Sequence, residues 1–203
     1  MPTLSLGGQT LATQTGSDGP TLSPVTFHTD QAFPTGHVIQ TVQAIKNDSE
    51  VLPANTSENV ISNWTLIITP QKTSSKILVY YSFESSWSTT LTARSYMERS
   101  VDSGGTFAKL TGAMGSDPGG SLGDPSLSFA GAYANWHPVK QSGSYLDTPS
   151  YTLGASVQYR IGCQSESSSP GIYIGQSHRD STGYHPRTAS VMIGMEIATW
   201  YIL

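Results

Sequence analysis

Apolar residues alternate with polar and glycine residues along residues 151–163, YTLGASVQYRIGC. Successive side chains of a β-strand point to opposite faces, so this period of two predicts one strand over 151–163 with a single buried face. The buried set ends on Cys163, the only cysteine of the chain. We therefore expect Cys163 to point inward as a small apolar residue rather than to act as a reactive thiol.

Six further segments have the apolar runs and alternation of short strands: residues 36–45, 64–70, 75–84, 93–101, 125–136 and 189–203. The segment 75–84 is apolar on both alternating faces, which predicts a central strand partly covered on both sides. The segment 189–203 stays apolar close to the end of the chain, which favours a strand tied into the sheet or into a subunit interface.

Clusters of Gly, Pro, Ser and Asp separate these segments, as in DSGG at residues 102–105 and SSSPG at 167–171. No run of ten or more residues has a helical period, and residues 55–64 are expected to form one helical turn at most. Many short strands joined by turns predict an all-β fold, an antiparallel β-sandwich or jelly roll.

Residues 1–35 differ in composition from the rest of the chain. They are rich in Thr, Gly, Pro and Ser, and no Lys or Arg occurs before Lys46, so they do not resemble a secretory signal. We expect residues 1–35 to be an extended N-terminal arm without its own core, and residues 36–203 to be the folded domain. Short apolar stretches of the arm can add themselves to the sheet edge of a partner.

Charged residues make up only 12% of the 203 residues, and the formal net charge is −4. A chain with so few charges and a negative net charge does not provide the basic surface that binds phosphate backbones, so we expect no nucleic-acid partner. No apolar run reaches the 18 residues of a membrane span, so we expect no membrane insertion. The single cysteine rules out an intramolecular disulfide and a cysteine zinc site.

The motifs of common catalytic sites are absent. No G-x-S-x-G elbow surrounds a serine, and no paired histidine motif indicates zinc. Glycoside cleavage needs a pair of carboxylates at a set separation. The carboxylates considered for this role are scattered over turns and strand ends: Glu84, Glu98, Asp117, Asp124 and Asp147. Asp117 and Asp124 also offer oxygens to calcium, but Asp before Pro is typical of a turn, and the sequence leaves ion binding by this loop open. We therefore expect a protein that is not an enzyme, with no cofactor and no bound metal.

Two stretches mix aromatic and charged side chains in the way that recognition surfaces do, YANWHP at 133–138 and GQSHRDSTGYHPRT at 175–188. Aromatic rings stack on sugars or fill protein pockets, and Arg with Asp supplies oriented hydrogen bonds. The alternative, that Tyr133 and Trp136 pack the core or a subunit contact, stays open. The candidate recognition residues are Tyr133, Trp136, His137, His178, Arg179, Asp180, Tyr184, His185 and Arg187.

Four stretches together resemble small structural proteins of tailed bacteriophages: PTLSLGGQTLATQTGSDGP, FPTGHVIQTVQA, ITPQKTSSKILVYYSF and SVMIGMEIA. The middle of the chain, about residues 85–190, carries none of this resemblance specifically. The resemblance implies a virion protein, assembled in the host cytoplasm, with a jelly roll similar to the tumour-necrosis-factor and C1q type and usually a homotrimer. Members of this kind are tail fibre or receptor-binding proteins and head decoration proteins.

The expected function is therefore that of a trimeric tail fibre or receptor-binding protein. Its residues 1–35 bind other virion proteins, and its domain binds a host cell-surface glycan or protein. A capsid decoration protein that stabilises the head is the alternative, and a soluble trimeric lectin-like protein is a further one.

Overall fold

The computed structural model describes residues 3–6, 9–13, 21–22, 35–53, 58–87, 93–115, 127–130, 138–165, 171–178 and 187–199. The chain divides into two compact units, residues 1–33 and 34–203. In the first unit, three short strands form an antiparallel sheet: β1 (Thr3–Leu6), β2 (Gln9–Thr13) and β3 (Thr21–Leu22).

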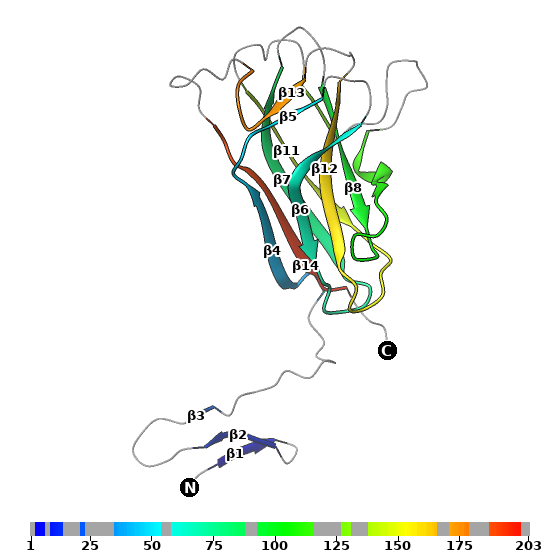
Figure 1. Ribbon diagram of the computed structural model, residues 1–203. Coiled ribbons are helices and arrows are strands. Elements are labelled where there is room, and N and C mark those ends of the chain that lie inside the picture. Colours follow the sequence, from blue (N-terminus) through cyan, green and yellow to red (C-terminus); the bar gives the residue numbers. More distant parts are fainter. Residues whose placement is uncertain are drawn as a thin grey trace. The chain divides into compact units, whose positions relative to one another are not determined.

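The second unit is a β-sandwich made of two sheets (Figure 1). The strands are β4 (Val38–Lys46), β5 (Glu50–Leu52), β6 (Asn59–Ile68), β7 (Lys76–Ser86), β8 (Ala93–Ser100), β9 (Ala108–Lys109), β10 (Ser128–Ala130), β11 (Val139–Asp147), β12 (Val157–Ser165), β13 (Ile172–Ile174) and β14 (Ser190–Ile197). Within the described residues the only helical element is the 3-10 turn η1 (Thr111–Ala113), in agreement with the expected absence of helices.

The strand order identifies the fold. One sheet runs β4-β14-β7, with β11 on the far edge of β7, and the other runs β6-β12-β8-β10. All of these pairs are antiparallel, and each sheet alternates early strands of the chain with late ones. This wound order is that of an eight-stranded jelly roll, so the expected antiparallel β-sandwich or jelly roll is confirmed. The short strands β5 and β13 extend the first sheet beyond Ser82 of β7.

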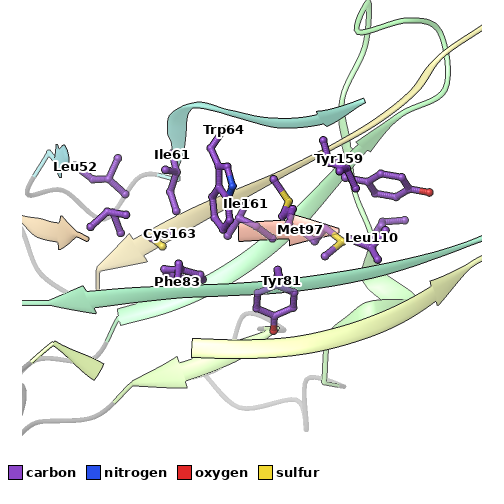
Figure 2. Packing of buried hydrophobic residues seen from close by; sticks show 14 of the residues in the cluster. Leu52, Ile61, Trp64, Tyr81, Phe83, Met97, Leu110, Tyr159, Ile161 and Cys163 are labelled. Atoms are coloured by element: carbon purple, nitrogen blue, oxygen red, sulfur yellow. The ribbon is translucent and has the colours of Figure 1, made fainter. Parts of the chain in front are cut away.

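The core lies between the two sheets, where the alternating positions of β7 and β12 face each other (Figure 2). The rings of Trp64 and Phe83 meet edge to face at 5.7 Å, and Trp64 Nε1 donates to the carbonyl of Ala44. Cys163 is fully buried, as its place in the alternation predicted. Burial, with a smaller contribution from Glu50, raises the pKa of the Cys163 thiol to about 12, so the thiol is protonated at neutral pH.

Three expectations about strands were wrong. Strand β12 begins only at Val157, because Ala155 N donates to the carbonyl of Thr152 and Gly154 has a φ of +94°, which closes a turn before it. Residues 59–64, expected to form one helical turn at most, belong to β6. Strand β11 was not expected at all.

Strand β7 is a central strand partly covered on both sides, as its sequence predicts. It lies between β14 and β11, and its inner face is fully buried. On its outer face Leu78 and Ser82 are half-buried, while Tyr80 is 39% exposed.

Candidate functional site

The sandwich has two ends that the chain uses differently. Residues Ser85–Trp87, Val139, Ile172–His178 and Arg187–Thr188 lie at one end, which we call the loop end. Residues Thr35–His37, Thr69–Lys76 and Ala198–Thr199 lie at the other, which we call the arm end. Figure 1 shows the ends of β7, β11 and β13 meeting at the loop end.

The strand register brings the borders of both expected recognition stretches together at the loop end. Val139 follows the first stretch and pairs with Ser85 on one side of β7. Ile174 precedes the second stretch and pairs with Ser85 on the other side. Because paired strands lie about 4.8 Å apart, the two borders are separated by roughly 10 Å.

Two of the nine candidate recognition residues lie in the described part of the chain. The ring of His178 meets the ring of Tyr173 edge to face at 5.3 Å, and Arg187 is exposed. The other candidates lie outside the described residues: Tyr133, Trp136, His137, Arg179, Asp180, Tyr184 and His185.

Polar groups at the loop end are ordered by a network of hydrogen bonds. Gln141 Nε2 donates to Ser85 Oγ at 2.6 Å, and Ser86 Oγ donates to the carbonyl of Gln176 at 2.9 Å. Gly175 adopts a φ of +68°, and a Cβ at this position would lie 2.8 Å from the carbonyl oxygen of Thr188. Glycine therefore allows the chain leaving β13 to turn tightly against Thr188.

Hydrogen-bonding capacity remains unused at this end. Among the described residues, the buried side-chain nitrogen and oxygen atoms without a partner are Trp87 Nε1, His178 Nδ1 and Thr188 Oγ1. Buried polar atoms in folded proteins normally have a partner, so these three atoms are a departure that calls for a reason. All three belong to the loop end, and His178 and Thr188 lie in the second expected recognition stretch, residues 175–188.

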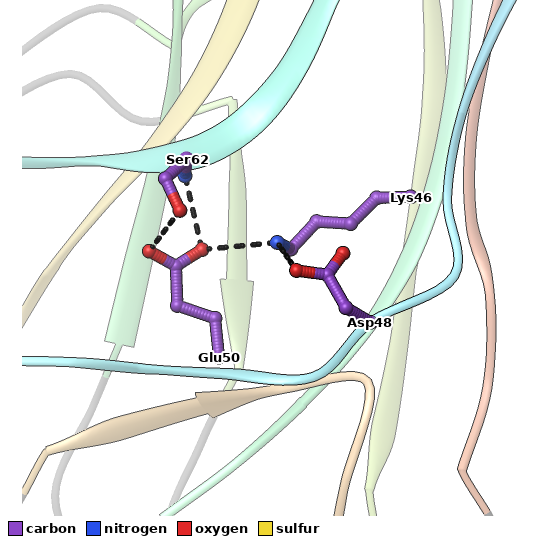
Figure 3. Close-up of polar contacts among 4 residues, drawn as sticks. All are labelled: Lys46, Asp48, Glu50 and Ser62. Carbon is purple, nitrogen blue, oxygen red and sulfur yellow. Dashed lines mark hydrogen bonds and ion pairs between the residues drawn. The ribbon is translucent and has the colours of Figure 1, made fainter.

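A buried cation supports the corner that leads into β5 (Figure 3). The side chain of Lys46 is fully buried, and its Nζ lies 3.1 Å from Asp48 Oδ2 and 3.4 Å from Glu50 Oε2. Glu50 also accepts from Ser62 N at 2.9 Å and from Ser62 Oγ at 2.7 Å. The hydrogen bond from Lys46 is the main cause that lowers the pKa of Asp48. The cluster joins β4 and β5 to β6, and its charges are satisfied within the chain.

The arm end contains a buried anion instead. Glu196 is fully buried, and its carboxylate accepts from Ser75 Oγ at 2.7 Å and from Gln40 Nε2 at 2.6 Å. It also accepts from the backbone N–H groups of Gln71 and Lys72 at 3.0 and 3.1 Å. The carboxylate therefore fixes the loop between β6 and β7 beside the point where the chain enters the sandwich, since Gly36 N donates to the carbonyl of Ala198.

Two of the carboxylates weighed for catalysis have structural partners. Glu98 accepts from Arg160 Nε at 2.6 Å, and Asp147 accepts from Arg99 and Tyr159. Asp117 and Asp124 lie outside the described residues. In the described ranges, no group of three or more His, Cys, Asp and Glu residues is placed to hold a metal ion. None of the helical segments in these ranges has the length and apolar character of a membrane span.

Sequence reasoning missed Lys46 and Glu196. The sequence indicated each of them only weakly. Each is a charged residue near the end of a largely apolar strand, at a position where the alternation places an inward side chain. Their partners come from other strands and loops, which alternation alone does not reveal.

Comparisons with known proteins assign no family. No protein-family description matches the chain, and no curated protein matches it. A solved structure described as "CBM4 structure and function" is similar to 78% of this chain and 92% of its own, with 8% sequence identity and a TM-score of 0.25. A TM-score this low does not establish a common fold, so the jelly-roll assignment rests on the strand order alone.

Proposed function

We propose that this chain is a non-catalytic structural protein of a phage particle, anchored by residues 1–35, that recognises a host cell-surface glycan or protein through its loop end. A tail fibre or receptor-binding protein is the role we favour. The observation that carries the proposal is the polarity of the jelly roll, in which the entry of the chain at Thr35 and the two described candidate residues, His178 and Arg187, belong to opposite ends.

The length of β7 gives the separation of these ends. Its first residue, Lys76, pairs with Ile197 next to the arm end, and its last residue, Ser86, pairs with Tyr173 at the loop end. Eleven strand residues at about 3.4 Å each span roughly 35 Å. The loop end therefore lies roughly this far from the end of the sandwich at which the chain enters it.

The chemistry of the loop end supports recognition of a polar ligand. The Tyr173 and His178 rings offer apolar faces, and the exposed Arg187 offers several donors in a fixed fork. Glycans combine apolar ring faces with hydroxyl groups, and binding sites for them use this pairing of aromatic and hydrogen-bonding side chains.

The first experiment measures the number of copies per particle, by quantitative mass spectrometry of purified virions normalised to the major capsid protein. A few to tens of copies would support the tail appendage. Hundreds of copies would indicate a capsid decoration protein held through the same arm. Absence from the particle would overturn the virion proposal, and retained glycan binding would then favour a soluble lectin-like protein.

The second experiment tests the loop end by binding of the purified full chain to host cells. The variants His178→Ala and Arg187→Ala are expected to lower binding about tenfold each, because each removes a contact group. Lys76→Ala is the matched control, since it removes a cation outside the loop end. Equal binding by all three variants would show that recognition does not use His178 or Arg187.

A further inference from the structure

The unpartnered polar atoms of the described residues are concentrated at the loop end. They are Trp87 Nε1, His178 Nδ1 and Thr188 Oγ1. A buried donor or acceptor without a partner destabilises the folded chain, because it has given up its hydrogen bonds to water. Their restriction to one end of the sandwich indicates a common cause, and a ligand that pairs with them is such a cause.

The three residues lie around β13 and the turn that follows it. Trp87 directly follows the β7 residue that pairs with Tyr173, and the rings of Tyr173 and His178 meet at 5.3 Å. Thr188 N donates at 3.0 Å to the carbonyl of Gly175, two residues after Tyr173. Because paired strands lie about 4.8 Å apart and successive strand residues about 3.4 Å, all three lie within roughly 10 Å of Tyr173.

The side chains of this group combine a fixed base with two adjustable members. Trp87 is 1% exposed and packs in the core, so its indole is held in place. His178 and Thr188 are only half-buried. Rotation about side-chain bonds is fast at the surface, so their polar atoms can turn towards a ligand without a change of the backbone. The backbone beneath them is fixed, since Gly175 N donates to the carbonyl of Glu84 at 2.8 Å.

The chemistry of the three groups favours hydroxyl groups as their partners. An indole N–H only donates, a threonine hydroxyl donates and accepts, and Nδ1 of a neutral imidazole does one or the other. A ligand hydroxyl can pair with each of them, whereas a carboxylate or phosphate only accepts and an ammonium only donates. The rings of Tyr173 and His178 add apolar surface beside these groups. Hydroxyl groups on an apolar ring are the chemistry of an uncharged sugar.

We infer that Trp87, His178 and Thr188 form a subsite for an uncharged sugar, whose hydroxyl groups pair with their unpartnered atoms. The inference rests on the proposed function and narrows it, from a host glycan or protein to a neutral glycan. A site built to pair with a ligand hydroxyl discriminates strongly against ligands that lack it, because its own polar groups would stay unpaired. Trp87 and Thr188 thus determine specificity, together with His178.

Nuclear magnetic resonance of the isotope-labelled full chain tests the subsite through its indole N–H signals. The probes are lactose, maltotriose and chitotriose as uncharged sugars, and trigalacturonate and inorganic phosphate as anions. We expect the Trp87 signal, assigned with the variant Trp87→Phe, to shift with at least one uncharged sugar and with neither anion. Trp64 is the internal control, because its Nε1 donates to the carbonyl of Ala44 and its signal should not shift.

The variant Thr188→Val keeps the size of the side chain and removes its hydroxyl. We expect sugar binding about tenfold weaker, and a higher melting temperature of the ligand-free chain because an unpaired buried group is gone. A hydroxyl with a structural role would give a lower melting temperature instead. Thr65→Val is the matched control, because Thr65 is also half-buried but lies on β6 of the opposite sheet, and it should leave sugar binding unchanged.

The outcomes separate this inference from the proposed function. Binding to host cells without a Trp87 shift in any uncharged sugar would overturn the inference and leave the proposed function standing, with a protein as receptor. A shift with trigalacturonate or phosphate alone would overturn it by assigning the site to an anion, and unchanged sugar binding by Thr188→Val would overturn it as well. A Trp87 shift in a chain that does not bind host cells would support the subsite and count against host recognition.

Discussion

Arg99 Nη1 on β8 lies 2.7 and 2.9 Å from the two carboxylate oxygens of Asp147 on β11. Tyr159 on β12 donates its hydroxyl to the same carboxylate at 2.8 Å. Burial, followed by the charge of Asp147, raises the pKa of Tyr159 far above its ordinary value, so the phenol stays a donor. Since β8 and β12 belong to one sheet and β11 to the other, this contact joins the two layers of the sandwich.

Asp147→Asn is therefore expected to destabilise the fold. The substitution keeps the size of the side chain but removes the charge that balances Arg99, and breaking a buried ion pair leaves a poorly solvated charge. Because Arg99 is 27% exposed, we expect a loss of about 2–4 kcal/mol in the free energy of unfolding, slightly below the range for fully buried pairs.

Urea unfolding of the full chain, followed by tryptophan fluorescence, measures this loss. The control is Glu98→Gln, which breaks the more exposed pair with Arg160 and should cost under about 1 kcal/mol. Equal losses in the two variants would contradict the structural role of Asp147.

Acid should weaken the corner around Lys46. The hydrogen bond from Lys46 lowers the pKa of Asp48 below its ordinary value of 3.8 in the folded state. A lowered carboxyl pKa gives stability that is complete above the unfolded pKa and is lost as the pH falls through the folded pKa. We expect the urea concentration at the midpoint of unfolding to decrease as the pH drops below about 4. In the Asp48→Asn variant this decrease should be smaller.

Midpoints measured from pH 7 to 2.5 test this expectation, and the two curves should converge at the acid end. In Asp48→Asn the midpoint should still decline somewhat, because the pKa of Asp102 is also lowered. The largest cause of that lowering is the hydrogen bond from the Ser100 side chain. Curves that run parallel at all pH values would show that Asp48 does not contribute through its ionisation.

The sequence predicted the fold where one face of a strand is uniformly apolar. Strand β7 was found because Ile77, Val79, Tyr81 and Phe83 fill its inward positions. Strand β14 was found because Val191, Ile193, Met195 and Ile197 alternate along its outer face. Strand β11 was missed because its inward positions include Gln141 and Gly143. The polar side chain of Gln141 can face inward because it donates a hydrogen bond to Ser85. Position 143 is a glycine where a Cβ would lie only 2.7 Å from the hydroxyl of Tyr81.

The candidate site could be predicted only in part, for a similar reason. Aromatic and charged composition indicated the stretch that contains His178 and Arg187. The buried Lys46 and Glu196 could not be recognised, because Glu196 is stabilised by the backbone of Gln71 and Lys72, more than 120 positions away in sequence. Local patterns do not contain information about such partners.

Gly162→Ala should be much more damaging than its small size suggests. A Cβ at Gly162 would lie 2.2 Å from Cζ of Tyr96, and the ring of Tyr96 is itself nearly fully buried. Overpacking of this kind costs about 1–3 kcal/mol, because the ring must leave its rotamer or the strand must move. Gly115→Ala is the control, since nothing lies within 4 Å of a Cβ there. Thermal unfolding followed by circular dichroism should separate the two variants, and a similar melting temperature would contradict the close packing.

Glu196→Gln tests the anchoring of the loop at the arm end. A glutamine keeps one acceptor oxygen but places an NH₂ group against the donors that face Glu196, which include the N–H groups of Gln71 and Lys72. Unsatisfied buried donors cost about 1–3 kcal/mol each, so we expect a loss of at least about 2 kcal/mol in the free energy of unfolding.

Hydrogen exchange provides the sharper readout, because it reports the two amides individually. In the Glu196→Gln variant, the amides of Gln71 and Lys72 should exchange much faster, while the amides of β12 change only by the global loss of stability. Glu84→Gln is the control, because it removes a carboxylate from the same sheet that is only half-buried, and it should leave the exchange of Gln71 unchanged. Unchanged exchange at Gln71 and Lys72 in Glu196→Gln would mean that other contacts hold this loop. Faster exchange would establish the buried carboxylate as the group that holds the loop between β6 and β7.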